Sequence, residues 1–206
     1  MSVRTLRTTV IPRIFAGGSD ETSVRASLQD LGLEHPERQA YIPSAWWILR
    51  WLLPQSAVGP EDTFVEFGCG KGRIVLDAAQ RYRFKTVIGV ELSEELVDVA
   101  RALVVQRGGR LRCDDVRIEA ADATQFPVPD DMTYAYLFNP FTGETFMRVL
   151  DNIIESLDRV PRKVTIIYVN PVEHEALMAT GRFRLLRHVR TTRLVTPTGA
   201  AIYESL

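Results

Sequence analysis

The stretch Thr63-Phe-Val-Glu-Phe-Gly-Cys-Gly-Lys-Gly-Arg-Ile-Val-Leu-Asp-Ala-Ala79 decides the fold of this chain. Its first part, Phe64 to Phe67, is apolar except for Glu66 and is typical of a buried β-strand. Three alternating glycines follow, and an amphipathic run from Arg73 to about Tyr82 indicates a helix. Strand, glycine turn and helix in this order predict a ligand-binding loop, because glycine permits a positive φ and a close approach of the backbone to a ligand.

The spacing of the glycines indicates the class of ligand. The dinucleotide fingerprint is Gly-x-Gly-x-x-Gly, with a pyrophosphate at the helix N-terminus. Here Glu66 is followed by Gly68, Gly70 and Gly72, and a carboxylate at the strand end suits a cationic group better than a pyrophosphate. A glycine-rich turn that only starts an α/β domain is the structural alternative.

This pattern resembles motif I of the class I S-adenosylmethionine (SAM)-dependent methyltransferases. The resemblance implies that SAM is the cofactor and that Glu66 faces the ammonium group of its methionine part. It also implies that Gly68, Cys69, Gly70 and Gly72 pass beneath the amino-acid and ribose parts. We expect Cys69 to be a small packing residue in this turn rather than a nucleophile.

Two further acids follow later apolar runs. The run after the first helix ends on Glu91, roughly twenty residues beyond the last glycine, the interval at which nucleotide-binding folds place a carboxylate on a ribose diol. Leu92 adjoins it, and a solvent-facing acid is the alternative. A third run closes on Asp122. The resemblance places Asp122 against the adenine amino group, with Ala123 beside it.

Asn139, Pro140 and Phe141 follow the fourth predicted strand and bear most on the methyl acceptor. Methyltransferases of this class that act on adenine or glutamine carry Asp/Asn-Pro-Pro-Tyr/Phe here. In that motif a side-chain oxygen and a backbone carbonyl accept hydrogen bonds from the NH₂ group, and the ring packs on its plane. This chain lacks one proline and has Thr142 after Phe141, so the match is partial. A loop that shapes the pocket through proline stiffness is the alternative.

An oxygen acceptor would need a general base. His174, which follows the fifth strand, is a candidate for this role, and His35 and Tyr41 are others from the N-terminal part. A histidine at a helix start that serves only as a surface or capping residue is the alternative for His174. No cluster of His, Asp and Glu at ligand spacing indicates a metal, and none is expected.

Residues 1–53 are predicted to form an N-terminal arm and helical cap, and residues 54–206 the SAM-binding core. Within the cap, Tyr41-Ile-Pro-Ser44 enters a helix that Pro54 ends, with Ser44 placed as its N-cap. This entry resembles the start of small lysine-directed methyltransferases with a seven-stranded sheet. The resemblance implies that Tyr41 and Ser44 lie over SAM as parts of a lid.

The remaining pattern predicts an α/β fold. Seven strands are expected, of which the first five alternate with helices and the last two form a hairpin across Pro197-Thr-Gly199. Alternation of strand and helix requires parallel strands with right-handed crossovers. We therefore expect a doubly wound, mostly parallel seven-stranded sheet with a C-terminal antiparallel hairpin and helices on both faces.

The bulk composition limits the function classes. The 206 residues are 46% hydrophobic and 25% charged, with a formal net charge of −1, as in ordinary globular proteins. Such a balance gives no global basic field, which argues against nucleic acid as a partner and leaves a small molecule or a protein as the methyl acceptor. The sequence contains no apolar run of membrane-spanning length and no apolar core of a signal peptide, so a cytoplasmic protein is expected.

The leading interpretation is therefore a SAM-dependent methyltransferase acting on nitrogen of a protein side chain or small molecule. Transfer to an oxygen, for instance of a small molecule or natural product, is the first alternative. A nicotinamide oxidoreductase is disfavoured by the glycine spacing and the terminal hairpin. The last alternative is a non-catalytic module that holds SAM without turnover.

Overall fold

The computed structural model describes residues 27, 29, 31, 33–39, 42–45, 47–190 and 199–206. Tyr41 and most of the predicted arm lie outside these residues. The strands are β1 (Thr63–Phe67), β2 (Thr86–Glu91), β3 (Asp115–Ala120), β4 (Met132–Phe138), β5 (Thr165–Val169), β6 (Phe183–Val189) and β7 (Ala200–Ser205). The α-helices are α1 (Ile48–Leu52), α2 (Arg73–Arg81), α3 (Glu94–Arg107), α4 (Gly143–Arg159) and α5 (His174–Ala179).

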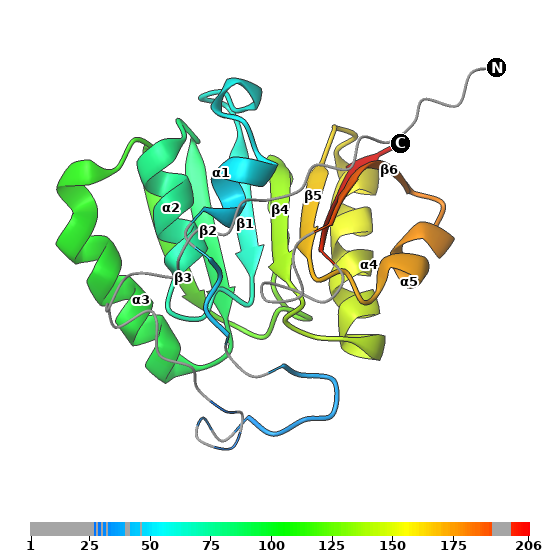
Figure 1. Cartoon of the computed structure of the whole chain (residues 1–206), viewed down its shortest axis with the longest axis horizontal. Coiled ribbons are helices and arrows are strands. Elements are labelled where there is room, and N and C mark those ends of the chain that lie inside the picture. Colours follow the sequence, from blue (N-terminus) through cyan, green and yellow to red (C-terminus); the bar gives the residue numbers. More distant parts are fainter. Residues whose placement is uncertain are drawn as a thin grey trace.

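The strands form one seven-stranded sheet in the order β3-β2-β1-β4-β5-β7-β6. The pairs from β3 through to β5 are parallel, and β7 pairs antiparallel with both β5 and β6. The first strand, β1, lies in the middle of the sheet, and the next two are added on one side, out to β3. The chain then returns to β4 on the other side of β1 and continues toward β6 at the opposite edge (Figure 1). The predicted doubly wound sheet with its C-terminal antiparallel strands is confirmed.

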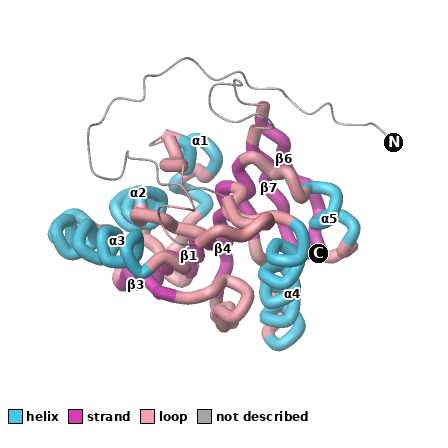
Figure 2. The backbone as a smooth tube through the Cα atoms, turned by 90° about the horizontal axis from the view of Figure 1, so that it is seen from below, coloured by secondary structure: helices cyan, strands magenta, loops and turns pink. Residues whose placement is uncertain are grey.

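Helices cover both faces of the sheet, and successive strand residues divide between two cores. Phe64 and Tyr136 point toward α1, α2 and α3, whereas their neighbours Val65 and Leu137 point toward α4 and α5. This alternation is the period of two that any pleated strand imposes. Figure 2 shows α1 and α2 on one side of β1 and β4, with α4 on the other.

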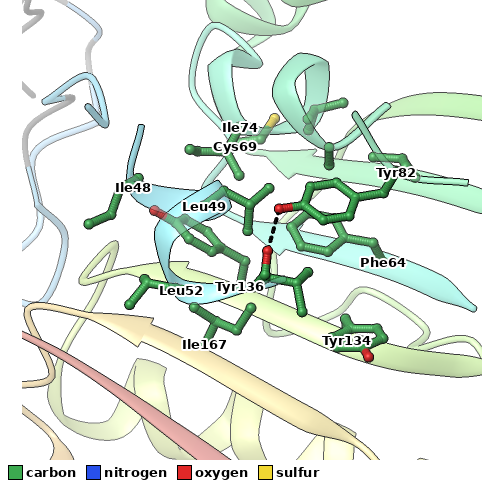
Figure 3. Packing of buried hydrophobic residues seen from close by; sticks show 14 of the residues in the cluster. Ile48, Leu49, Leu52, Phe64, Cys69, Ile74, Tyr82, Tyr134, Tyr136 and Ile167 are labelled. Carbon is green, nitrogen blue, oxygen red and sulfur yellow. Dashed lines mark hydrogen bonds between the residues drawn. The ribbon is translucent and has the colours of Figure 1, made fainter. Parts of the chain in front are cut away.

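The predicted cap helix is shorter than its sequence pattern indicates. We expected Ser44 to cap it, but α1 begins at Ile48, and its N-cap residue Trp47 makes no side-chain capping bond. Ser44 is instead buried, and its carbonyl accepts a hydrogen bond from the Arg73 guanidinium at 3.1 Å. The Ser44 carbonyl is thus bonded to the start of α2, and the helix starts four residues after Ser44. Leu49 and Leu52 of α1 then pack over the ring of Tyr136 (Figure 3).

The connection between β3 and β4 carries no helix. The strand ends at Ala120, two residues before Asp122, so this acid lies in a loop rather than at the last position of the strand. Phe126 and Val128 from the same loop are buried in the core beneath α4. The loop thus covers part of the sheet face that a crossover helix would otherwise cover.

Candidate cofactor and acceptor site

A cavity of about 690 Å³ lies at the carboxyl ends of the strands. That is the edge at which open α/β sheets bind ligands, and the size lies in the range of small-molecule sites, roughly 300–1,000 Å³. The predicted site residues that line it are Ser44, Glu66, Gly68, Cys69, Glu91, Leu92, Asp122, Ala123, Asn139, Pro140 and Phe141. Residues far apart in the sequence therefore meet at one edge of the sheet.

The glycine turn has the conformation that its spacing predicts. Gly68, Gly70 and Gly72 have φ of 75°, 53° and 73°, which residues with a side chain rarely adopt. A Cβ on Gly68 would lie 2.5 Å from the Cβ of Pro140, so this glycine also allows the loop after β4 to pack directly on the turn.

Gly70 and Gly72, also predicted to bind the cofactor, are not among the residues that line the cavity. The amide of Gly70 donates to a carboxylate oxygen of Glu91 at 2.9 Å. A Cβ on Gly72 would lie 3.0 Å from the Cβ of Ala100, so this glycine lets α3 approach the start of α2. These two glycines shape the turn, and Gly68 and Cys69 present it to the cavity.

Glu66 is buried, with 4% of its surface exposed, and it lines the cavity. One carboxylate oxygen accepts a hydrogen bond from the amide of Val75 at 3.1 Å. Burial raises the pKa of the Glu66 carboxyl well above its ordinary value, with the nearby Glu91 adding to the rise. An ammonium group in the cavity would reverse this effect, because an opposite charge favours the ionised carboxylate.

Glu91 holds three backbone amides. Its Oε2 accepts from Gly70 at 2.9 Å, and its Oε1 accepts from Leu92 at 2.8 Å and Ser93 at 2.9 Å. The carboxylate thereby connects the glycine turn to the start of α3, where the Ser93 side chain caps the helix. A ribose at this point would share the carboxylate with these amides.

Asp122 uses one oxygen for its own loop. Oδ1 accepts hydrogen bonds from the amide and the hydroxyl of Thr124, both at 2.8 Å. Oδ2 is the oxygen left to accept a bond from a ligand amino group. Asp122, Ala123 and Thr124 all line the cavity.

Cys69 is 4% exposed, and burial raises the pKa of its thiol well above the ordinary value. A thiol that resists ionisation is a poor nucleophile. This agrees with the packing role expected from the sequence.

A segment before α1 closes one side of the cavity. We call residues 33–39 and 42–45 the strap; they are blue in Figure 1 and pass the ends of β1 and β4. The strap is bonded to the loop after β4: Gln39 N donates to the Pro140 carbonyl at 3.1 Å, and Thr142 N donates to the Glu37 carbonyl at 2.8 Å. The strap and the loop after β4, about a hundred residues apart in the sequence, thus form this part of the cavity wall together. An antiparallel β-bridge between Arg38 and Phe141 also joins them.

Glu37 fixes the strap to α4 through its side chain. Its carboxylate accepts from the amides of Glu144 at 3.0 Å and Thr145 at 2.9 Å, and from the Thr145 hydroxyl at 2.6 Å. These amides are among those that a helix N-terminus leaves without a partner of its own. The Thr145 hydroxyl and these amides lower the pKa of the Glu37 carboxyl. No local pattern in the sequence predicted this contact, because its partners lie more than a hundred residues away.

The residues predicted to face the methyl acceptor lie in the loop after β4, at the cavity. Asn139 and Phe141 line the cavity, and Asn139 has φ of 42°. Its side-chain oxygen accepts a hydrogen bond from the Tyr168 hydroxyl at 3.4 Å. Pro140 packs on Gly68 as described, so the position of Asn139 relative to the glycine turn is set by direct contact.

His174 does not line the cavity, contrary to the expectation that it lies near the acceptor. Its Nδ1 is 2.7 Å from the hydroxyl of Tyr203, and the two rings pack with centroids 5.7 Å apart. Tyr203 on β7 therefore turns the histidine away from the strand ends. His35 in the strap does line the cavity, and its Nδ1 accepts from the Glu37 amide at 3.3 Å.

No group of three or more His, Cys, Asp or Glu side chains in the described part of the chain is arranged to hold a metal ion. Across the same residues, no helix has the length and apolar character needed to cross a membrane.

The central part of the chain is similar to known proteins. Residues 64–160 match the family described as methyltransferase domain. A protein-lysine N-methyltransferase of Saccharolobus islandicus is 32% identical over 68 residues, 33% of this chain and 42% of that protein. A demethylmenaquinone methyltransferase of Symbiobacterium thermophilum is 29% identical over 135 residues, 65% of this chain and 45% of that protein. The matches thus span less than half the length of these two relatives.

Solved structures share the fold. An RNA methyltransferase of Salinibacter ruber in complex with S-adenosyl-L-homocysteine superposes with a TM-score of 0.56 at 20% identity, over 80% of this chain and 92% of that one. A precorrin 8W decarboxylase of Methanobacterium thermoautotrophicum gives a TM-score of 0.55, also at 20% identity, over 80% and 91% of the two chains. At this identity the likeness establishes the fold alone.

Proposed function

We propose that this protein transfers a methyl group from SAM to a nitrogen atom. In support, residues 64–160 match the methyltransferase domain family, and the fold is that of the SAM-dependent methyltransferases. The nitrogen belongs to a protein side chain or a small molecule. The observation that carries the choice of nitrogen is the position of Asn139 at the cavity, with its side-chain oxygen held by Tyr168.

SAM is the cofactor, and three acids on one half of the sheet match its three polar parts. Glu66, the penultimate residue of β1, receives the ammonium group of the methionine part. Glu91 ends β2 and accepts the ribose hydroxyls, and Asp122 after β3 accepts the adenine amino group through Oδ2. Since β1, β2 and β3 are adjacent in the sheet, the three acids follow the length of one extended ligand.

Ser44 and the strap lie on the other side of this ligand. Ser44 lines the cavity, and its carbonyl is bonded to Arg73 at the start of α2. The strap acts as the lid over the cofactor, as its resemblance to lysine-directed enzymes implies. Tyr41, the other predicted lid residue, lies outside the described residues.

Methyl transfer needs little chemistry from the protein, because the sulfonium already carries a good leaving group. The nitrogen lone pair forms the new N–C bond while the S–C bond breaks and its electrons remain on sulfur. The protein has to align nitrogen, methyl and sulfur in a line and exclude other nucleophiles. The side-chain oxygen of Asn139 orients the nitrogen by accepting a hydrogen bond from one of its N–H groups, and Phe141 packs beside the methyl acceptor.

An oxygen acceptor is the second candidate, favoured by one observation: His35 lines the cavity and could remove a hydroxyl proton. The two candidate functions predict opposite effects of the same substitutions on methyl transfer. Transfer to nitrogen depends on Asn139 and tolerates His35→Ala, whereas transfer to oxygen shows the reverse.

The test begins with calorimetry of S-adenosylhomocysteine and, separately, of NADH. We expect S-adenosylhomocysteine to bind with a dissociation constant of about 1 µM or lower, which corresponds to about −8 kcal/mol, and NADH not to bind. Transfer of labelled methyl from SAM is then measured to lysine-containing peptides, small amines and phenols. If NADH binds and S-adenosylhomocysteine does not, the assignment of SAM as the cofactor is refuted. Binding of S-adenosylhomocysteine with transfer only to phenols would refute the nitrogen acceptor.

A further inference from the structure

Two neighbouring strands end in the same unusual way. Among the described residues, only Asn139 and Asn170 have a positive φ without being glycine, at 42° and 54°. Each is followed by a proline, and each comes directly after the last residue of its strand. Because Phe138 of β4 pairs with Val169 of β5, the two asparagines lie at the same level on adjacent strands. Both line the cavity.

Backbone bonds hold the second turn in place. The Asn170 amide donates to the Gly199 carbonyl at 2.7 Å, and its own carbonyl accepts from Val172 at 2.8 Å. Tyr168, two residues earlier on β5, donates its hydroxyl to the Asn139 side chain and so links the two strand ends. Asparagine adopts this conformation more readily than other residues with a side chain, and non-glycine residues that adopt it cluster at functional sites.

The order of the strands places the two turns beyond the cofactor. The acids that match SAM lie at the carboxyl ends of β1, β2 and β3, and Pro140 lies on Gly68, which directly follows β1. Asn139 is therefore next to the glycine turn, and Asn170 is one strand further away. This half of the cavity, at the ends of β4 and β5, is what remains for the acceptor.

We propose that Asn170 is a second acceptor-recognition residue, which pairs with Asn139 so that the two side-chain oxygens hold the two N–H bonds of one NH₂ group. The proposal rests on methyl transfer to nitrogen and specifies the acceptor as a primary amine.

The chemistry explains why two acceptors are useful. A neutral primary amine has two N–H donors and one lone pair. If each asparagine oxygen accepts a hydrogen bond from one N–H group, the orientation of the amine is fixed. The lone pair of its nitrogen then points toward the methyl group of SAM. As the N–C bond forms, the S–C bond breaks and leaves S-adenosylhomocysteine, and the methylated nitrogen becomes a secondary ammonium that carries the positive charge of the former sulfonium. A hydroxyl has one O–H bond and can use only one of the two oxygens.

The experiment uses the full chain saturated with S-adenosylhomocysteine and follows the ¹⁵N side-chain amide signals of Asn139 and Asn170. n-Butylamine is titrated at alkaline pH, where part of it is neutral, and n-butanol is the matched probe with one donor. We expect both signals to shift with one shared dissociation constant for n-butylamine. Asn170→Gly should raise that constant at least tenfold, since glycine keeps the positive φ without the side chain. The affinities for n-butanol and for S-adenosylhomocysteine should change less than twofold.

Three results would overturn the proposal. Shifts confined to Asn139, or an Asn170→Gly variant that binds n-butylamine like the parent protein, would assign acceptor recognition to Asn139 alone. Absence of both shifts while S-adenosylhomocysteine binds would remove the amine site and leave the cofactor assignment standing. Failure of S-adenosylhomocysteine to bind the parent protein would instead refute the proposed function, and the inference with it.

Discussion

Replacement of Glu91 by alanine should weaken both the fold and the cofactor site. The carboxylate accepts three backbone hydrogen bonds, from Gly70, Leu92 and Ser93, at 2.8–2.9 Å. A reading of the sequence alone would place this acid at a strand end and predict that Glu91→Ala leaves the fold unaffected. The structure changes that expectation, because the same side chain holds the glycine turn and the two residues that lead into α3.

The size of the effect follows from the number of bonds. A hydrogen bond to a charged group contributes about 1.5–3 kcal/mol net, and a buried amide left without a partner costs about 1–3 kcal/mol. Glu91 is half-buried, so water replaces part of what Glu91→Ala removes. We therefore expect the free energy of unfolding to fall by about 2–4 kcal/mol, which corresponds to a decrease in Tm of roughly 4–16 °C for a chain of this size.

Glu91→Gln is the matched control. The glutamine oxygen can keep the bonds from Leu92 and Ser93, but its NH₂ group then faces the Gly70 amide, and one bond of the three is lost. We expect a loss of unfolding free energy of about 1–2 kcal/mol. Glutamine can still bond to ribose hydroxyls, so the affinity for S-adenosylhomocysteine should fall less than in Glu91→Ala, where a decrease of at least tenfold is expected.

Urea unfolding followed by circular dichroism gives the stabilities, and calorimetry gives the affinities. If Glu91→Ala is as stable as the parent protein, the three backbone bonds do not form in solution. If its stability falls while the affinity for S-adenosylhomocysteine is unchanged, Glu91 has a structural role only, and the assignment to the ribose is wrong.

Three further predictions concern the cavity wall. Gly68→Ala should reduce binding of S-adenosylhomocysteine at least tenfold, because alanine is strained at a φ of 75° and its Cβ would overlap Pro140; normal affinity would mean that the loop after β4 moves freely. The raised pKa of Glu66 predicts that cofactor affinity increases as pH rises from the ordinary value of 4.5 through the higher pKa of the folded state, since only the ionised carboxylate attracts the ammonium. Calorimetry in buffers of different ionisation enthalpy should accordingly detect release of the Glu66 proton when S-adenosylhomocysteine binds, and this release should be absent in Glu66→Gln. An affinity that does not depend on pH would contradict this prediction. The lowered pKa of Glu37 means that its contribution to stability is present above 4.5 and is lost as pH falls through the folded-state pKa. Glu37→Ala should therefore speed hydrogen exchange in residues 33–39 and at Thr145 at neutral pH, and exchange equal to that of the parent protein would show that the strap is held by its backbone bonds alone.

Much of the fold was predictable because its determinants are local. The alternation of apolar runs with helical patterns specifies strands and crossover helices, and the glycines after β1 specify a turn with positive φ. Once the strands are parallel, Glu66, Glu91 and Asn139 must meet at one edge, since their strand ends lie together. Asp122 was assigned to a strand end but lies in the loop after β3, an error of two residues that does not remove it from the cavity.

The sequence by itself therefore determined the sheet, the glycine turn and the residues that converge at the carboxyl ends of the strands. Only the tertiary structure decided which of these side chains face the cavity. His174 follows β5 as predicted, but Tyr203 of β7 binds its ring and turns it away. Glu37 reaches α4 through three bonds that no local pattern indicates. Backbone conformation depends on neighbours in the chain, whereas a side chain's partner depends on segments that the folded sheet brings together from far along it.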